Sequence, residues 1–139
     1  MSSELDRDEI NNLNLPHTNN SELIVYGKLP VMTNNYCYLG KSNKCNSSCP
    51  KKCTTNSIYV LKDRLGFEFR ILPDNIFNQT TIFNSKITSI TYNDLQITSI
   101  RIDILDESID KILDIINTVK SGNRFEGKEY TNGKTATRN

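Results

Sequence analysis

The sequence predicts a domain of the α/β class, and three observations lead to this prediction. Residues 23–26 form a short apolar run rich in β-branched side chains, which is typical of a buried strand. Residues 67–72 alternate between apolar and polar side chains, which is typical of a half-buried strand. After Asp106, apolar side chains recur at helical spacing. The 139 residues suffice for one domain.

The first predicted element is a short helix at residues 6–13, which Ser2 or Ser3 would cap. A loop rich in helix-breaking residues follows at residues 15–20. The run at residues 23–26 comes next. Its nearly continuous apolar character predicts a strand that is covered on both faces, as in a parallel sheet.

A β-hairpin is predicted in the middle of the chain. Residues 58–61 and 67–72 have strand character, and a turn that contains Gly66 separates them. Residues 81–83 and 98–104 also predict strands, whereas residues 87–90 fit either a strand or a loop.

The clearest predicted helix starts at residues 106–108 and stops at Ser121 and Gly122. Asp106 and Glu107 are interpreted as charges that favour a helix N-terminus. The predicted core-facing stripe, with Ile115 just beside it, consists of Ile109, Ile112, Leu113, Ile116 and Val119.

These elements predict a single α/β unit at residues 1–123 and a polar tail at residues 124–139. Within that unit, a cysteine loop at residues 35–56 precedes the hairpin at residues 57–73. Two helices and several strands are too few to cover both faces of a parallel sheet.

The formal net charge of +1 excludes a strong positive field over the whole chain. Residues 41–64 are nevertheless locally basic, with six cationic side chains against one carboxylate. The lysines of this segment fit a solvated loop, a counter-charge for thiolates, or a contact for an anionic partner.

The N-terminal segment lacks the apolar core of a signal peptide, because residues 1–12 are acidic and polar. No apolar run approaches the ~20 residues that a membrane helix needs. We therefore expect a cytoplasmic protein without a membrane partner, in which thiols stay reduced.

All four cysteines lie close together in the sequence and predict one metal site, with the ligands Cys37, Cys45, Cys49 and Cys53. An iron–sulfur cluster is the favoured occupant, because such clusters are held by thiolates that often come from one compact run. Zinc is an alternative, although zinc sites more often use two close pairs far apart in the sequence. A disulfide framework is less suited to a reduced compartment.

A catalytic thiol is a further alternative, but it needs a base within hydrogen-bond reach. The single histidine, His17, lies in the breaker-rich loop and is interpreted as an exposed loop residue. The sequence contains no phosphate-binding Walker loop, dinucleotide glycine fingerprint, HExxH or GxSxG motif.

Several segments in the right order resemble the collagenase-like peptidases, the family numbered thirty-two among peptidases of unassigned mechanism. Residues 26–32 read Tyr-Gly-Lys-Leu-Pro-Val-Met, where the family has Tyr-Gly-Arg-x-Pro-Leu-Met. Residues 59–66 read Tyr-Val-Leu-Lys-Asp-Arg-Leu-Gly, where the family has Tyr-Tyr-Leu-Lys-Asp-Arg-x-Gly. Shorter similarities cover residues 36–38, 81–85, 100–103 and 130–133, together with Cys45 and Cys49.

The resemblance implies a TIM-like barrel, which takes roughly 250 residues when it is complete. The chain is similar to only the last part of such a barrel, its C-terminal strands and helices, with the cysteine loop and hairpin as an insertion. The resemblance therefore implies that the missing part of the barrel, or a homologous subunit, is a partner.

The family name implies peptide hydrolysis, but other branches of the family bind iron–sulfur clusters. Those branches hydroxylate RNA bases or quinone precursors, so the resemblance implies redox chemistry on RNA or on a small aromatic substrate. We expect Lys62, Asp63, Arg64 and Arg101 to contact substrate or partner. A non-enzymatic zinc or interaction module is the remaining alternative.

The chain departs from the family pattern at the metal site and at the end. Asn78 stands where relatives have a downstream cysteine, and Cys53 is an additional one. Lys134 and Thr135 break the family's closing motif. These departures predict either a relocated fourth ligand at Cys53 or a degenerate site.

Overall fold

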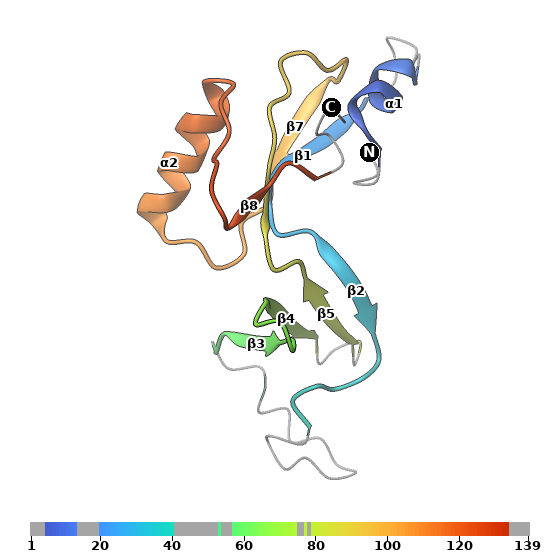
Figure 1. Cartoon of the computed structure of the whole chain (residues 1–139), viewed down its shortest axis with the longest axis vertical. Helices are drawn as coiled ribbons and strands as arrows, with labels where there is room; N and C mark the ends of the chain where they lie inside the picture. Colours follow the sequence, from blue (N-terminus) through green and yellow to red (C-terminus); the bar gives the residue numbers. More distant parts are fainter. Residues whose placement is uncertain are drawn as a thin grey trace. The chain divides into compact units, whose positions relative to one another are not determined.

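The computed structural model of the chain describes residues 5–13, 20–40, 53, 57–74, 77 and 79–133. The chain divides into two compact units, which are described separately. Unit 1 comprises Met1–Leu29 and Lys86–Asn139, and unit 2 comprises Pro30–Ser85. The described residues form a mixed α/β structure with two four-stranded sheets and contain no closed barrel (Figure 1).

The sheet of unit 1 has the strand order β7-β1-β6-β8. Its strands are β1 (Glu22–Gly27), β6 (Ile87–Ser89), β7 (Ser99–Ile102) and β8 (Tyr130–Thr131). Strands β1 and β7 are parallel, β1 and β6 are antiparallel, and β6 and β8 are parallel. The predicted buried strand at residues 23–26 is confirmed, but the sheet is mixed and not parallel, because β6 runs antiparallel to β1.

The core of unit 1 lies between β1 and the helix α2 (Ile109–Lys120). Leu23 and Val25 of β1 are buried in one cluster with Ile115 and Val119 of α2. The cluster is completed by Ile10, Tyr26, Ile90 and Leu95. Burial of such apolar side chains stabilises the fold by roughly 1.5–3 kcal/mol each.

Helix α2 has the predicted length and caps, and the predicted core-facing stripe is correct for Val119 but wrong for Ile109 and Leu113. Ile115 is 0% exposed, whereas Ile109 is 77% and Leu113 is 56% exposed. Leu113 precedes Ile115 by two residues and therefore lies about 200° away around a helix of 3.6 residues per turn. The helix has more apolar positions than one face can hold, and the sequence pattern does not decide which of them packs against β1.

The N-terminal helix α1 (Arg7–Asn12) is capped by Asp6 and not, as predicted, by a serine. The Asp6 carboxylate accepts a hydrogen bond from Glu9 N at 2.9 Å, and Glu9 Oε2 accepts one from Asp6 N at 2.8 Å. This reciprocal arrangement is a capping box, which satisfies two backbone donors at the helix start.

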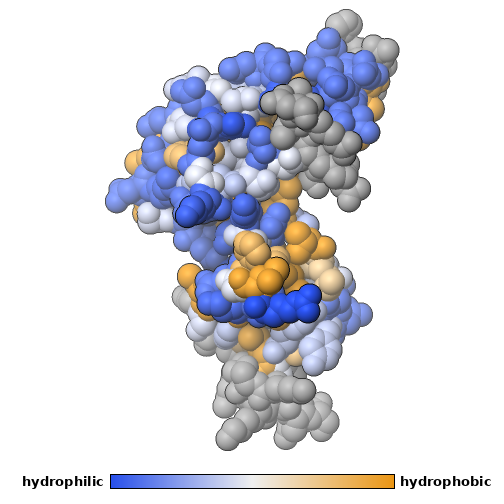
Figure 2. All heavy atoms as spheres, in the orientation of Figure 1, coloured by the Kyte–Doolittle hydropathy of each residue, from blue (hydrophilic) through white to orange (hydrophobic). Residues whose placement is uncertain are grey.

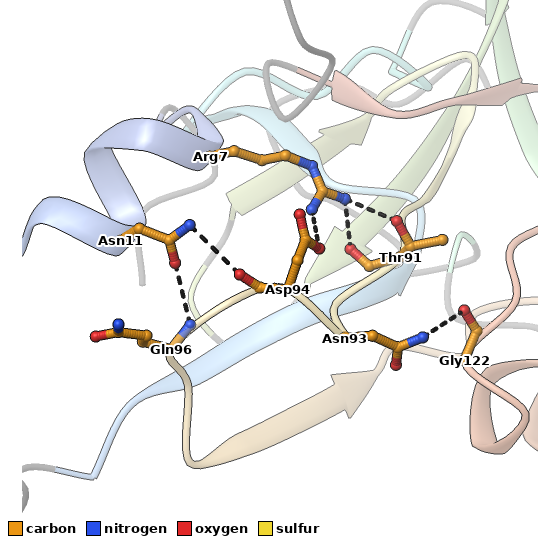
Figure 3. Close-up of polar contacts among 7 residues, drawn as sticks. All are labelled: Arg7, Asn11, Thr91, Asn93, Asp94, Gln96 and Gly122. Carbon is orange, nitrogen blue, oxygen red and sulfur yellow. Dashed lines mark hydrogen bonds and ion pairs between the residues drawn. The ribbon is translucent and has the colours of Figure 1, made fainter.

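Polar side chains of α1 attach it to the loop between β6 and β7 (Figure 3). Arg7 forms an ion pair with Asp94 and donates a hydrogen bond to Thr91 O at 2.8 Å. Asn11 accepts from Gln96 N at 3.1 Å and donates to Asp94 O at 3.4 Å. The short helix is therefore held by several long-range bonds as well as by burial of Ile10.

The same loop also contacts the end of α2 (Figure 3). Asn93 donates to Gly122 O at 3.4 Å, and the Tyr92 hydroxyl donates to Val119 O at 3.0 Å. Gly122 has a φ of 72°, and a Cβ there would lie 2.4 Å from the Asn93 amide nitrogen. The predicted stop at Ser121 and Gly122 is thus explained by backbone conformation and by lack of space.

Residues 124–133 pack onto unit 1, although they were expected to begin a polar tail. The Phe125 ring stacks on Tyr130 with the centroids 5.5 Å apart and meets the Tyr26 ring edge-on at 5.7 Å. Phe125 N also donates to Ser89 Oγ at 2.8 Å. Although most residues of this segment are polar, its two aromatic side chains provide enough apolar surface to pack against the sheet. Residues 134–139 lie outside the described residues.

Unit 2 contains an antiparallel sheet with the strand order β2-β5-β4-β3. Its strands are β2 (Pro30–Asn34), β3 (Tyr59–Lys62), β4 (Glu68–Asp74) and β5 (Gln79–Phe83). The predicted hairpin is confirmed as the β3–β4 pair. Strand β2 was not predicted because Pro30 opens it, and proline is tolerated only at the start or the edge of a sheet.

Several apolar side chains of unit 2 remain exposed, and Figure 2 shows apolar atoms at the surface of its sheet.

Among the described residues, no helix is long and apolar enough to cross a membrane.

The buried position of Ile115 predicts a large difference between two similar substitutions in α2. Ile115→Ala should lower the free energy of unfolding by about 2–5 kcal/mol, because it leaves a cavity in the core. Ile109→Ala, at an exposed position of the same helix, should change it by less than ~0.5 kcal/mol. Urea unfolding followed by circular dichroism measures both values. Equal losses would show that α2 packs through another face.

The ion pair between Arg7 and Asp94 predicts a pH-dependent contribution to stability. The hydrogen bond from Arg7 lowers the pKa of Asp94 in the folded chain. The ion pair therefore stabilises the fold fully above the pKa of about 3.9 that an aspartate has in the unfolded chain. This stabilisation is lost as the pH falls through the lower pKa that Asp94 has in the folded chain.

Asp94→Asn should consequently lower the free energy of unfolding at neutral pH by at most ~1 kcal/mol, because the Asp94 carboxylate is largely exposed. The variant and the parent chain should converge in acid. Glu129→Gln, which removes an exposed carboxylate of the same unit, is the control and should show a smaller effect. If Asp94→Asn still had a lower free energy of unfolding than the parent chain in acid, the electrostatic explanation would be ruled out.

Candidate functional site

The topology of unit 2 brings both ends of the cysteine loop to one end of its sheet. Strands β2 and β4 run in one direction, and β3 and β5 run in the other. The end of β2 at Asn34 and the start of β3 at Tyr59 therefore lie at the same end of the sheet, here called the loop end. These two outer strands are three strand spacings apart, or about 14 Å.

The turn between β4 and β5 lies at the loop end as well, because β4 ends and β5 begins there. The Asp74 carboxylate accepts a hydrogen bond from Phe77 N at 3.1 Å in this turn. Asn78, which stands at the family's downstream cysteine position, lies outside the described residues. Its described neighbours Phe77 and Gln79 nevertheless belong to the same end of the sheet as the start of the cysteine loop.

Asn34, the last residue of β2, organises the first turn of the cysteine loop. Its Oδ1 accepts a hydrogen bond from Tyr36 N at 3.0 Å, and its Nδ2 donates to the Tyr38 hydroxyl at 2.9 Å. Gly40 N donates to Cys37 O at 3.2 Å and closes the next turn. An asparagine that accepts from the backbone two residues later forms an Asx turn.

Two of the four predicted metal ligands can be located. Cys37 is exposed and Cys53 is half-buried, and both thiols are free of disulfides. Cys45 and Cys49 lie outside the described residues, as does His17. Among the described residues, no group of three or more histidine, cysteine, aspartate or glutamate side chains could hold a metal ion. The four-cysteine site stays a prediction.

Asp63 has a structural role at the tip of the β3–β4 hairpin. Its carboxylate accepts hydrogen bonds from Leu65 N at 2.8 Å and from Phe67 N at 2.9 Å. Lys62 forms an exposed ion pair with Glu68 at 3.4 Å, and Arg64 is exposed. Of the three predicted contact residues at this tip, Lys62 and Arg64 present cationic side chains to solvent.

Arg101, the fourth predicted contact residue, belongs to unit 1 and connects neighbouring strands. Its guanidinium lies 3.0 Å from the Glu22 carboxylate of β1 and 2.8 Å from the Asp103 carboxylate just after β7. Hydrogen bonding to Asp103 raises the pKa of Arg101 above its usual value. The positively charged Arg101 side chain is thus held between two carboxylates at the parallel pair β1–β7.

The carboxyl ends of β1 and β7 approach each other closely. Asp103 N donates to Tyr26 O at 2.8 Å. Gly27 has a φ of 139°, and a Cβ there would lie 2.6 Å from Asp103 O. The glycine of the Tyr-Gly segment therefore permits a backbone contact that any side chain would prevent.

Tyr26, which the sequence places in a strand and in the Tyr-Gly segment, carries a buried phenol. It is 0% exposed, and its hydroxyl has no hydrogen-bond partner among the described residues. Burial, reinforced by Glu107 and other acids, raises the pKa of Tyr26 well above its usual value. The phenol is therefore neutral at physiological pH.

A surface hollow of ≈ 350 Å³ lies in unit 1 near the aromatic residues of the C-terminal segment. Phe125 and Tyr130 line it together with Lys86 and Arg124. Arg124 is paired with Glu126 at 2.7 Å. None of the residues predicted from the sequence as ligands or contacts lines this hollow.

Asn34 is the residue near the candidate site that the sequence reading missed. Its signal is present in the sequence, because an asparagine followed two residues later by the start of a turn is typical of an Asx turn.

Comparison with known proteins gave no match: no family model, curated protein or solved structure matches the chain.

The hydrogen bonds of Asp63 predict how the hairpin responds to substitution. Asp63→Ala should lower the free energy of unfolding by about 1 kcal/mol, because two backbone N–H groups lose their acceptor. Asp63→Asn keeps an acceptor oxygen and should cost less. Arg64→Ala, at the adjacent exposed position, is the matched control and should leave stability unchanged. Chemical denaturation of the three variants gives these values, and an equal cost for Arg64→Ala would contradict the assignment.

Proposed function

We propose that the chain is part of a collagenase-like peptidase family protein whose cysteine loop binds an iron–sulfur cluster. The proposed ligands are Cys37, Cys45, Cys49 and Cys53. Four thiolates from one chain are the usual ligand set of such clusters. When bound, a cluster supplies one-electron transfer, at a potential that its surroundings set.

The observation that carries this proposal is the position of the cysteine loop on unit 2. A loop with four thiols starts from one outer strand of the sheet and returns to the other outer strand at the same end. Cys37 follows β2 by three residues, in a turn that leaves its side chain exposed, and its thiol is free. Long loops on a rigid sheet are common places for binding sites.

We propose that unit 1 supplies the last strands of a TIM-like barrel. Strands β1 and β7 are parallel neighbours, and helix α2 follows β7 and packs on β1. The β1–β7 pair and α2 fit the strand-helix repeat of a barrel, whose active sites lie at the carboxyl ends of the strands, whereas β6, which is antiparallel to β1, departs from an all-parallel barrel sheet. The missing barrel part or a homologous subunit would complete it, and Tyr26 and Asp103 lie at the corresponding strand ends.

The proposed chemistry is redox or hydroxylation on RNA or on a small aromatic substrate. The exposed cations Lys62 and Arg64 suit contact with phosphates, and so do the lysines of residues 41–52. The hairpin tip that carries Lys62 and Arg64 lies at the opposite end of the sheet from the start of the cysteine loop. Arg101 is held by two acids and is better suited to orientation at the strand ends than to binding an anion. Zinc bound by the same thiols is the alternative occupant.

Metal analysis of the whole chain tests this proposal. The protein is purified without oxygen, and iron, sulfide and zinc are assayed together with the visible absorption spectrum. We expect iron and sulfide in similar amounts with a broad visible band. Cys37→Ser should abolish the band, whereas the exposed-site control Ser57→Ala should keep it.

The other outcomes contradict the proposal in distinct ways. One zinc per chain without sulfide would replace the redox function by a structural metal site. Protein that contains none of the three elements, even after anaerobic reconstitution with iron and sulfide, would exclude a metal function for the cysteines. A cluster that survives Cys37→Ser would remove Cys37 from the ligand set.

A further inference from the structure

We propose that the surface hollow of unit 1 binds a small organic anion, in which a carboxylate or a phosphate is attached to a planar ring. The hollow has a volume of ≈ 350 Å³. Small-molecule sites typically measure roughly 300–1,000 Å³, so the ligand is a small one. The inference goes beyond the proposed function, because no cysteine lines the hollow and no metal is needed.

The walls of the hollow are fixed by backbone hydrogen bonds. The residues that line it come from β6, from β8 and from the segment that leads to β8, and the two strands form a parallel pair. Phe125 N donates to Ser89 Oγ at 2.8 Å, and Tyr130 N donates to Gly127 O at 3.1 Å. A site whose walls are already ordered loses less conformational freedom when a ligand binds.

Arg124 offers hydrogen-bond donors for the anionic group. Its Nε and Nη2 both donate to Glu126 Oε1, at 3.0 Å and 2.7 Å. A guanidinium has five N–H donors, so two on Nη1 and one on Nη2 remain. These three donors have no acceptor in the part of the chain that the structure describes. The edge between Nη1 and Nη2 has the geometry that binds a carboxylate or a phosphate through two parallel hydrogen bonds.

The charges around the hollow favour an anion. Among the described residues that line it, Lys86 and Arg124 are cations and Glu126 is the one carboxylate. The Arg124 side chain is 35% exposed, whereas the Glu126 side chain is 72% exposed. Solvent therefore screens the negative charge more than it screens the positive charge of Arg124.

An aromatic wall next to these charges suits a planar ring. Phe125 and Tyr130 line the hollow and stack on each other, and the Tyr26 ring supports Phe125 edge-on. A Cβ at Gly127 would lie 3.8 Å from the Tyr130 ring, so the glycine leaves that part of the ring uncovered. A ligand ring gains contact energy on such a wall in addition to burying apolar surface.

Titration of the whole chain with benzoate and with phenyl phosphate tests the inference. Amide signals are followed by two-dimensional NMR, and we expect saturable shifts at Phe125, Gly127 and Tyr130. Saturable binding of either compound supports the proposal, and the tighter of the two identifies the anionic group. Added salt should weaken the binding, because it screens the charges.

Two related compounds separate the contributions of charge and ring in the parent chain, without any variant. Benzamide is the uncharged counterpart of benzoate and should bind roughly tenfold more weakly, because a charged acceptor forms the stronger hydrogen bonds with a guanidinium. Cyclohexanecarboxylate keeps the charge but has no planar ring, and it should also bind more weakly than benzoate.

Substitution of Arg124 tests the assigned donor. Arg124→Ala should raise the dissociation constant of benzoate roughly tenfold, because charge-assisted hydrogen bonds are lost. Arg124→Lys keeps the charge without the planar fork and should recover only part of the affinity. Lys128→Ala is the matched control, since it removes an exposed cation of the same segment that does not line the hollow. It should bind like the parent chain, and thermal unfolding checks that each variant is folded.

The opposite results would overturn the inference. Absence of a saturable shift with both anions would exclude the site. Equal affinity for benzoate and benzamide would exclude recognition of charge, and an equal loss in Lys128→Ala and Arg124→Ala would reduce the effect to general electrostatic attraction. A chain that binds benzoate but takes up no metal would support this inference while it contradicts the proposed function.

Discussion

The antiparallel pairing of β1 with β6 is the constraint on which the arrangement of the chain depends. Tyr26 pairs with Ser89 and Gly27 with Thr88, immediately before the chain enters unit 2 and immediately after it leaves. Unit 2 is therefore an insertion whose two ends are joined by strand hydrogen bonds. Strand β1 meanwhile keeps its other edge for β7 and its apolar side chains for α2. A single buried strand thus serves the sheet, the core and the closure of the insertion.

The directions of the strands determine which loops of unit 2 lie at the same end of its sheet. Four antiparallel strands in the order β2-β5-β4-β3 place the cysteine loop and the β4–β5 turn at one end of the sheet. Two side chains near that end accept hydrogen bonds from backbone N–H groups. Asn34 does so in the first turn of the loop, and Asp74 does so in the turn after β4. The start of the cysteine loop and the turn after β4 each depend on a hydrogen bond between a side chain and the backbone.

The sequence predicted the features that local chemistry determines. The strands β1 and β4 and the caps of α2 each follow from the side-chain pattern, and the structure confirms them. The burial within β4 does not alternate, because Arg70 is buried beside Ile71. Features that depend on distant partners were missed. Helix α2 has several apolar positions, and packing against β1 buries Ile115 and leaves Ile109 exposed. Phe125 packs at the core because its ring contacts the rings of Tyr26 and Tyr130. Asn34 is a sequence signal for the turn that contains Cys37. No sequence signal predicts that the Tyr26 hydroxyl is buried, because residues distant in the sequence surround it only in the folded unit.

The separation of the two outer strands of unit 2 has a consequence for the freedom of the connection between them. A gap of about 14 Å can be bridged by ~4–5 extended residues, since each residue spans at most ~3.3–3.6 Å. Residues 35–58 connect β2 to β3, far more chain than this span requires. Because loop-closure entropy grows only slowly with length, the surplus costs little stability. The connection can therefore lengthen, shorten or change its residues between Gly40 and Ile58 at little cost to the pairing of the sheet.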